Sequence, residues 1–504
     1  MLRLDLNKDL MNPLVHIFSP SGIVVIEAIL LAFINLATYS ILLRVCDMQT
    51  IGLWALVNSL LGFSRAADFW SRGLSSFVAD ALGRGDERAA ASFVSTAALS
   101  GAVGNLALAG LGTTTVYLLS ESIAGTGHAA VLRDVLPIMA ATFWLTSLVG
   151  IYQLAFFGFG RPGLKVIQSI GGAILFLLAA TLLAPAHALA GILLAQALQA
   201  GGMLVFAVVA FHGFIAPKGA VLWRRERFTH LAMFSSKSIV VGVFQLAIDP
   251  MIRLLASHFG GLSSVAVVEL ASRLIMIVRG VIISLGQILV PAFARLSAEG
   301  TVNAAALYRD ASRLFLLASI PAFSLMLSAA PAMEPILFGR PESRFVPFIW
   351  ILSAAWFANT LASSAYFLLH GRRQLRPLFW SHLIMTAGAF AAGNLGGLLA
   401  GIHGALIGVA AAFVASAVYL IRKATHIIRQ PSGYWTVILA DRKALLPLAA
   451  ASLAVAAINV GGIQSDDTGI RLAGYTLAVA MTLGACLISV PVRDILTLAG
   501  RIKS

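Results

Sequence analysis

Six lysine and arginine side chains lie inside apolar segments that are long enough to cross a membrane. They are Arg65, Arg72, Lys237, Arg253, Arg273 and Arg279. A cation at membrane depth is costly unless it pairs with an acid, reaches the interface or faces an aqueous cavity, so it indicates a functional site. The acids of the same segments are Glu27, Asp68, Asp249 and Glu269. The excess of cations predicts a wet cavity that attracts a phosphate-bearing anion, because the planar donor fork of arginine matches phosphate oxygens.

The second apolar segment places three charged residues on one helical face. Arg65, Asp68 and Arg72 are spaced i, i+3 and i+7, which brings side chains to the same side of a helix. Asp68 cannot neutralise both arginines fully, so the pattern predicts either a local salt-bridge ladder or a cation facing a cavity. Because an intramembrane acid can bind a proton or Na⁺, Asp68 and Glu27 are candidate ion-coupling residues. For Glu27, near the inner end of its segment, surface exposure is the alternative.

Two later segments, 230–256 and 263–294, carry the other cations. Local spacing predicts i,i+4 ion pairs between Asp249 and Arg253 and between Glu269 and Arg273. The same spacing rule gives no acidic partner for Lys237 or Arg279.

Lys237 has no acid at i±3 or i±4. It either faces the cavity or extends its side chain to the inner surface. Arg279 has no local partner either and lies near the middle of its segment, where reaching the interface is hardest. We therefore expect Arg279, with Arg273, Arg65, Arg72 and Lys237, to contact the anionic headgroup of a substrate.

The composition of the chain indicates that these residues lie on transmembrane helices. The chain has 504 residues, of which 59% are hydrophobic and 11% charged, against about 25% charged residues in soluble domains. A transmembrane helix needs about 20 apolar residues. The predicted spans, about fourteen, are 21–43, 50–80, 91–119, 134–157, 164–184, 189–212, 230–256, 263–294, 308–330, 346–370, 377–399, 404–421, 444–463 and 471–492. The expected fold class is an all-α polytopic membrane protein.

The distribution of basic residues predicts the orientation of these spans. With a cytoplasmic N-terminus, 24 lysines and arginines fall on the inner side and 5 on the outer side, which follows the positive-inside rule and places both termini in the cytoplasm. The net charge of +14 does not indicate nucleic-acid binding, because the charges lie in short clusters between apolar runs and not on one basic module.

An internal repeat divides the chain. The run Gly160-Arg161 recurs as Gly371-Arg372 at an offset of 211, and the long second and eighth spans match at nearly the same offset. Two parallel halves of six spans are predicted, a plan that many transporters use. The expected lobes are 1–213 (spans 1–6) and 214–425 (spans 7–12), with two further spans and a cytoplasmic tail in 426–504. Gly393, Gly397 and Gly401 have G-x-x-x-G spacing, which favours close helix packing.

Motifs of soluble enzymes are absent from the sequence. It contains no G-x-x-x-x-G-K-[ST], H-E-x-x-H, C-x-x-C or G-x-S-x-G. We expect neither catalysis nor a cofactor or metal, and any energy must come from gradients, from a partner or from the substrate's own concentration. A membrane glycosyltransferase would show a large loop with clustered acids, and a purely structural subunit would not need intramembrane arginines.

Two segments carry a resemblance to a known family. The stretch from Gly52-Leu53-Trp54 through Arg84-Gly85-Asp86 resembles the second span of the polysaccharide exporter family, the O-antigen or oligosaccharide flippases of the multidrug/oligosaccharidyl-lipid/polysaccharide exporter superfamily. The segment from Glu269-Leu270 to Pro291-Ala292 is similar to the eighth span of that family.

The resemblance implies two six-helix lobes in a V around a central cavity, with two extra C-terminal helices. It implies alternating access that carries a polyprenyl-diphosphate oligosaccharide across the bacterial cytoplasmic membrane. The implied partners are this lipid-linked glycan, membrane lipids, and the glycan polymerase and glycosyltransferases that act beside it. A gradient-driven multidrug or small-molecule antiporter on the same scaffold is the alternative, and the positive sign of the predicted cavity favours the flippase.

Overall fold

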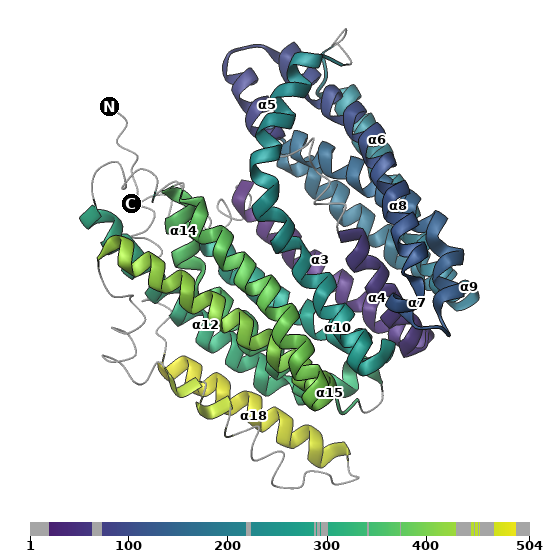
Figure 1. Cartoon of the computed structure of the whole chain (residues 1–504). Coiled ribbons are helices and arrows are strands. Elements are labelled where there is room, and N and C mark those ends of the chain that lie inside the picture. Colours follow the sequence, from purple (N-terminus) through teal and green to yellow (C-terminus); the bar gives the residue numbers. More distant parts are fainter. Residues whose placement is uncertain are drawn as a thin grey trace. The chain divides into compact units, whose positions relative to one another are not determined.

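The computed structural model describes residues 20–62, 73–217, 223–286, 301–339, 342–372, 374–429 and 468–489, with a few single positions between these ranges. Every regular element in these ranges is a helix (Figure 1), which confirms the predicted all-α class. Contacts divide the chain into two compact units, Met1–Pro250 and Met251–Ser504. We describe each unit by itself, and the predicted lobe boundaries stay predictions.

The helices of the first unit follow the predicted spans closely. They are α3 (Pro20–Val45), α4 (Met48–Gly62), α5 (Leu74–Gly83), α6 (Glu87–Leu118), α7 (Ser120–Ala124), α8 (Ala129–Gly158) and α9 (Pro162–Phe214), and α10 (Arg225–Gly286) begins here. The predicted second span, 50–80, is split between α4 and α5. α9 contains two predicted spans, 164–184 and 189–212, which meet at the non-helical residue Ala188.

The second unit begins within α10. It contains the rest of α10, then α12 (Thr301–Phe338), α13 (Phe345–Leu361), α14 (Ser363–Gly371), α15 (Leu375–Ile428) and α18 (Thr468–Ser489). α10 is interrupted at Gly261, between the predicted spans 230–256 and 263–294. α15 breaks at Ala400 and Gly401, between 377–399 and 404–421, as α9 of the first unit breaks at Ala188. The predicted span 444–463 lies almost entirely outside the described residues.

The length and surface of these helices fit a membrane. Six helices among the described residues are long and apolar enough to cross a bilayer, and α9 and α15 have 53 and 54 residues each. About 20 residues span the hydrocarbon core, so each of these two has the length of two spans. Large apolar side chains are exposed along them, including Leu182 and Leu398, each 77% exposed. Lipid, and not water, is the solvent that such surfaces require.

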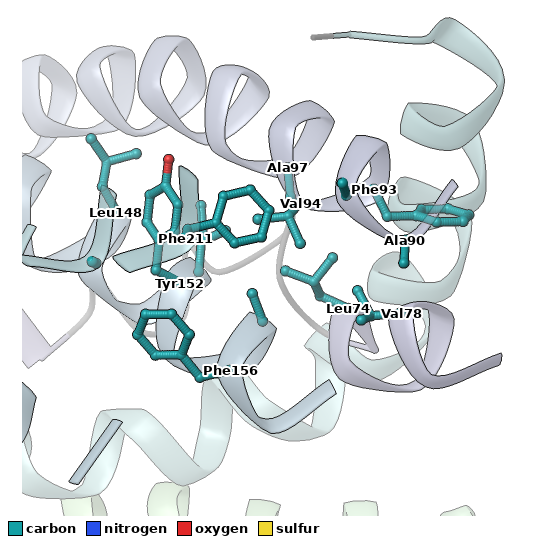
Figure 2. Packing of buried hydrophobic residues seen from close by; sticks show 14 of the residues in the cluster. Leu74, Val78, Ala90, Phe93, Val94, Ala97, Leu148, Tyr152, Phe156 and Phe211 are labelled. Carbon is teal, nitrogen blue, oxygen red and sulfur yellow. The ribbon is translucent and has the colours of Figure 1, made fainter. Parts of the chain in front are cut away.

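The short helix α5 is held by an apolar cluster in the first unit (Figure 2). Leu74 and Val78 of α5 pack there with Val94 of α6, Phe156 of α8 and Phe211 of α9, all at most 1% exposed. α6 and α8 lie side by side and both contact α5. The cluster therefore fixes the C-terminal part of the second predicted span against three other helices.

Two aspartates begin helices at the ends of spans. Asp86 precedes α6, and its carboxylate accepts a hydrogen bond of 2.7 Å from the backbone N–H of Ala89. Asp47 precedes α4 and accepts bonds of 3.1 Å from the N–H groups of Gln49 and Thr50. Partial burial tends to raise the pKa of Asp47, but the hydrogen bonds from Thr50 and Gln49 outweigh it and hold that pKa below its ordinary value. Both caps satisfy backbone donors that a helix start leaves open.

The glycines of α15 allow its two halves to pack closely, as their spacing predicts. A Cβ atom on Gly404 would collide with the backbone of Gly396, and one on Gly408 would collide with the backbone of Ala392. A Cβ on Gly397 would overlap the ring of Phe259. Backbone atoms cannot move aside cheaply, so only glycine fits at Gly404 and Gly408.

Substitution of Gly408 tests this close approach. We expect Gly408→Ala to lower the melting temperature of the detergent-purified protein clearly, because overpacking costs about 1–3 kcal/mol. Gly112→Ala in α6 is the matched control, because nothing lies within 4 Å of a Cβ there. The control variant should keep or slightly raise the melting temperature. Equal melting temperatures for the two variants would show that α15 does not need glycine at this crossing.

Candidate anion-binding site in the second unit

Glu269 of α10 is the centre of an ion-pair cluster. Its carboxylate is 3% exposed and accepts hydrogen bonds from Nε of Arg253 and Nε of Arg273, each of 2.7 Å. The Nη2 atom of Arg253 lies 2.5 Å from the same carboxylate. Each arginine uses a different oxygen of Glu269, so one buried anion orients two guanidinium groups. We call Arg253, Glu269 and Arg273 the arginine cluster; it holds two cations and one anion.

The other arginine of α10, Arg279, is half-buried and contacts α13. Its Nη2 donates a 3.0 Å hydrogen bond to Oδ1 of Asn359, and its guanidinium lies 5.0 Å from the centroid of the Trp356 ring. Trp356 in turn packs edge-on against Phe413 of α15, with ring centroids 4.9 Å apart. A cation over an aromatic face gains about 0.5–2 kcal/mol. Both of these contacts are with neutral groups, an amide oxygen and an indole ring, and they position the guanidinium.

The amide of Asn359 has a defined orientation. Because a guanidinium only donates, the atom that receives Arg279 is the carbonyl oxygen, and Nδ2 then points to Sδ of Met385, 3.6 Å away. Asn359 thus links α10 to α15 through α13. This network holds Arg279 at a fixed place within the predicted span 263–294.

The structure brings the predicted residues of α10 together only in part. The Glu269–Arg273 pair is confirmed. The predicted Asp249–Arg253 pair is wrong, because Arg253 binds Glu269, 16 residues further on, while Asp249 is exposed. Arg273 and Arg279 are six positions apart, which is about 9 Å along a helix and not on one face. Arg253 pairs with Glu269 and not with Asp249, because a buried carboxylate without a partner costs far more free energy than an exposed one.

Other predicted site residues cannot be placed. Arg65, Asp68 and Arg72 lie outside the described residues, and so does the side chain of Lys237. Their roles in substrate binding and ion coupling stay predictions.

Glu27, the other candidate ion-coupling residue, is buried in the first unit. It is 1% exposed, and one carboxylate oxygen lies 2.5 Å from Nζ of Lys165 at the start of α9. The ammonium group also lies 5.9 Å from the Phe157 ring centroid. Surface exposure, the alternative for Glu27, is therefore excluded, and its partner is a lysine at the start of the predicted span 164–184.

Reasoning from local spacing missed Asn359, Trp356 and Lys165. Asn359 is a polar residue in an apolar span, a signal that a search limited to charged residues passes over. Lys165 is 138 positions from Glu27, and no helical spacing rule covers that separation.

Comparison with solved structures identifies the fold. A multidrug resistance MATE family transporter of the MOP superfamily, in an inward-facing conformation, matches with a TM-score of 0.66 at 13% identity, over 79% of this chain and 94% of that one. The lipid II flippase MurJ, in an inward closed conformation, matches with a TM-score of 0.65 at 13% identity, over 95% of this chain and 99% of that one.

A third match is a MOP superfamily transporter from Pyrococcus furiosus, described as having a binding pocket of reverse polarity that suggests a different function. It has a TM-score of 0.60 at 15% identity, over 81% of this chain and 96% of that one. No family model and no curated protein matches the chain. The chain is thus a multi-pass, all-helical membrane protein with the fold of MOP superfamily transporters.

Removing the shared anion tests the arginine cluster. We expect Glu269→Gln to destabilise the protein by about 3–5 kcal/mol, because two buried guanidinium groups lose their counter-ion. Asp80→Asn is the control, because the Asp80–Arg84 pair is exposed and should be worth less than about 1 kcal/mol. Thermal unfolding in detergent measures both. A Glu269→Gln protein as stable as Asp80→Asn would contradict the account of Glu269 as an obligatory counter-ion.

The Glu27–Lys165 pair allows a double-mutant test. Lys165→Met should destabilise the first unit by about 3 kcal/mol or more, because it leaves a buried carboxylate without its partner. Adding Glu27→Gln removes that carboxylate and should restore most of the lost stability. Melting temperatures of the wild type, both single variants and the double variant give the coupling. Independent, additive losses would mean that the two groups do not interact.

Proposed function

We propose that the chain is a flippase that moves an anionic lipid-linked oligosaccharide, a polyprenyl-diphosphate glycan, across the bacterial cytoplasmic membrane by alternating access. The observation that carries this proposal is Arg279, a half-buried arginine in the predicted span 263–294 that Asn359 and Trp356 hold in place. The fold supports a transporter, and the charge supports an anionic substrate.

The energetics of the site favour a diphosphate. Glu269 supplies one negative charge to the two guanidinium groups of the arginine cluster, and Arg279 adds a third positive charge on the same helix. Bringing an anion to such a group replaces the water that the charge would otherwise need. Arginine binds phosphate oxygens through charge-assisted, often bidentate hydrogen bonds. A polyprenyl diphosphate is a substrate with this charge on a lipid that the bilayer already holds.

The alternative is a gradient-driven multidrug or small-molecule antiporter, because MATE transporters share the fold. A site for organic cations requires an excess of acids, whereas the described part of α10 has three arginines against Asp249 and Glu269 within its membrane segment. The Pyrococcus furiosus transporter is described in terms that link pocket polarity to function. The positive sign therefore favours the flippase.

Coupling and partners complete the proposal. Glu27, which pairs with Lys165, and Asp68 are the proposed ion-coupling residues. The proposed partners are the lipid-linked glycan, membrane lipids, and the glycosyltransferases and polymerase that make and extend the glycan. Both termini would lie in the cytoplasm.

Substitution of Arg279 tests the proposal. In proteoliposomes that contain a fluorescent polyprenyl-diphosphate oligosaccharide, we expect Arg279→Ala to reduce flipping at least tenfold, because a hydrogen bond to a charged group is worth about 1.5–3 kcal/mol. Arg279→Lys should retain part of the activity, because it keeps the charge but loses the fork.

Arg133→Ala provides the control for loss of a partly buried arginine. Arg133 pairs with Glu121 in the first unit, so flipping by this variant should equal that of the wild type. Normal flipping by a well-folded Arg279→Ala protein would contradict the proposed site. Efflux of organic cations with no flipping of the lipid would favour the antiporter instead.

A further inference from the structure

A chain of three hydrogen-bonded side chains crosses from α4 to α9 in the first unit. Nε1 of Trp54 donates a 3.0 Å bond to Oε1 of Gln196, and Nε2 of Gln196 donates a 2.6 Å bond to Oδ1 of Asn58. Trp54 and Asn58 are four residues apart on α4, so they lie on one face of that helix. We call these three residues the amide relay.

The first member of the relay fixes the direction of the others. An indole N–H can only donate, so the atom of Gln196 that faces it must be the carbonyl oxygen. The amino group of Gln196 then faces Asn58, and the atom of Asn58 that receives it must also be a carbonyl oxygen. The orientation of both amides therefore follows from the fact that an indole N–H only donates.

The relay leaves two donors at its end. Nδ2 of Asn58 carries two N–H groups, and within the residues that the structure describes neither has a hydrogen-bond acceptor. Asn58 is half-buried and lies in the predicted span 50–80. In such a place an unsatisfied amide is costly, and it can be satisfied only by water or by an acceptor atom of a ligand.

The relay is also rigid. Trp54 is 2% exposed and lies between the rings of Tyr39 and Phe176, with centroid distances of 5.7 Å and 6.1 Å. A packed indole cannot rotate to release Gln196, and Gln196 in turn restrains Asn58. A donor pair held in advance loses little entropy when it binds an acceptor.

We propose that Asn58 is a substrate-binding residue of the first unit, whose amino group donates hydrogen bonds to an oxygen of the transported molecule. This inference rests on the proposed flippase function and gives the first unit a neutral, donor-only subsite of its own. The acceptor is an oxygen of the glycan or of the diphosphate; both present the lone pairs that the two N–H groups require.

A purely structural role makes a different prediction. If the relay only ties α4 to α9, then Oδ1 of Asn58 is the important atom and Nδ2 is not. Asn58→Asp separates the two roles, because it keeps an oxygen for Gln196 and replaces the donor group with an acceptor of the same shape. Asn394→Asp is the matched control: the amide of Asn394 donates only to its own helix, at the carbonyl oxygen of Phe390.

The experiment measures the binding of two ligands to the full chain in nanodiscs. One ligand is a polyprenyl-diphosphate disaccharide, and the other is the same polyprenyl diphosphate without sugar. We expect Asn58→Asp to weaken binding of the disaccharide ligand at least fivefold, with a melting temperature close to that of the wild type, and Asn394→Asp to bind as the wild type does. A loss confined to the disaccharide ligand places the contact on the sugar, and a loss for both ligands places it on the diphosphate.

Two further variants keep the result decisive. Trp54→Phe removes the N–H that orients Gln196 but retains a ring, so it should weaken binding by a smaller factor of about two to three; this variant decides the question if Asn58→Asp does not fold. Unchanged binding by the folded test variant overturns the subsite. If Arg279→Ala still weakens both ligands in that case, the proposed function stands without it; if Arg279→Ala has no effect either, the proposed function fails as well.

Discussion

Every charged or polar side chain within the spans must find its solvation inside the protein, because the bilayer offers none. The described residues meet this requirement in three ways. Glu27 pairs with one lysine, Glu269 is shared by two arginines, and Arg279 is held by an amide and an indole ring. These solutions differ in what they leave for a substrate. In an ion pair an acid offsets the charge of the cation, whereas the amide and the indole ring that contact Arg279 are neutral.

This difference separates two arginines of the same helix. For Arg273 to bind an anionic ligand, its contact with Glu269 must weaken, and the buried carboxylate would then depend on Arg253 alone. The contacts of Arg279 differ in that Asn359 and Trp356 are both neutral groups. In the proposed function, the arginine cluster is therefore a structural support of α10, and Arg279 is the binding group.

The fold could be predicted from the sequence because its main determinant is local. A run of about 20 apolar residues is sufficient to specify a span, and breaks at Ala188, Gly261 and Ala400–Gly401 fall between the predicted spans. The site could be predicted only in part, because partners of buried charges are chosen by tertiary packing. The i,i+4 rule gave the Glu269–Arg273 pair but failed for Asp249, and it could not reach from Glu27 to Lys165. A search that counted charges alone also passed over Asn359 and the amide relay, although amides in apolar spans face the same solvation constraint.

A transporter must release what it binds, and this condition limits how strong each contact can be. A guanidinium buried with a carboxylate cannot leave it for a ligand without a large cost in free energy. A fully exposed guanidinium gains little free energy from binding an anion in water. The half-buried Arg279, held by Asn359 and Trp356, lies between these limits. The same reasoning applies to Asn58, whose uncharged donors add selectivity for oxygen atoms but only about 0.5–1.5 kcal/mol each. One charged contact and several weak neutral contacts allow specific recognition in a complex that can still dissociate. The proposed flippase would need both properties, because it must bind its substrate on one side of the membrane and release it on the other.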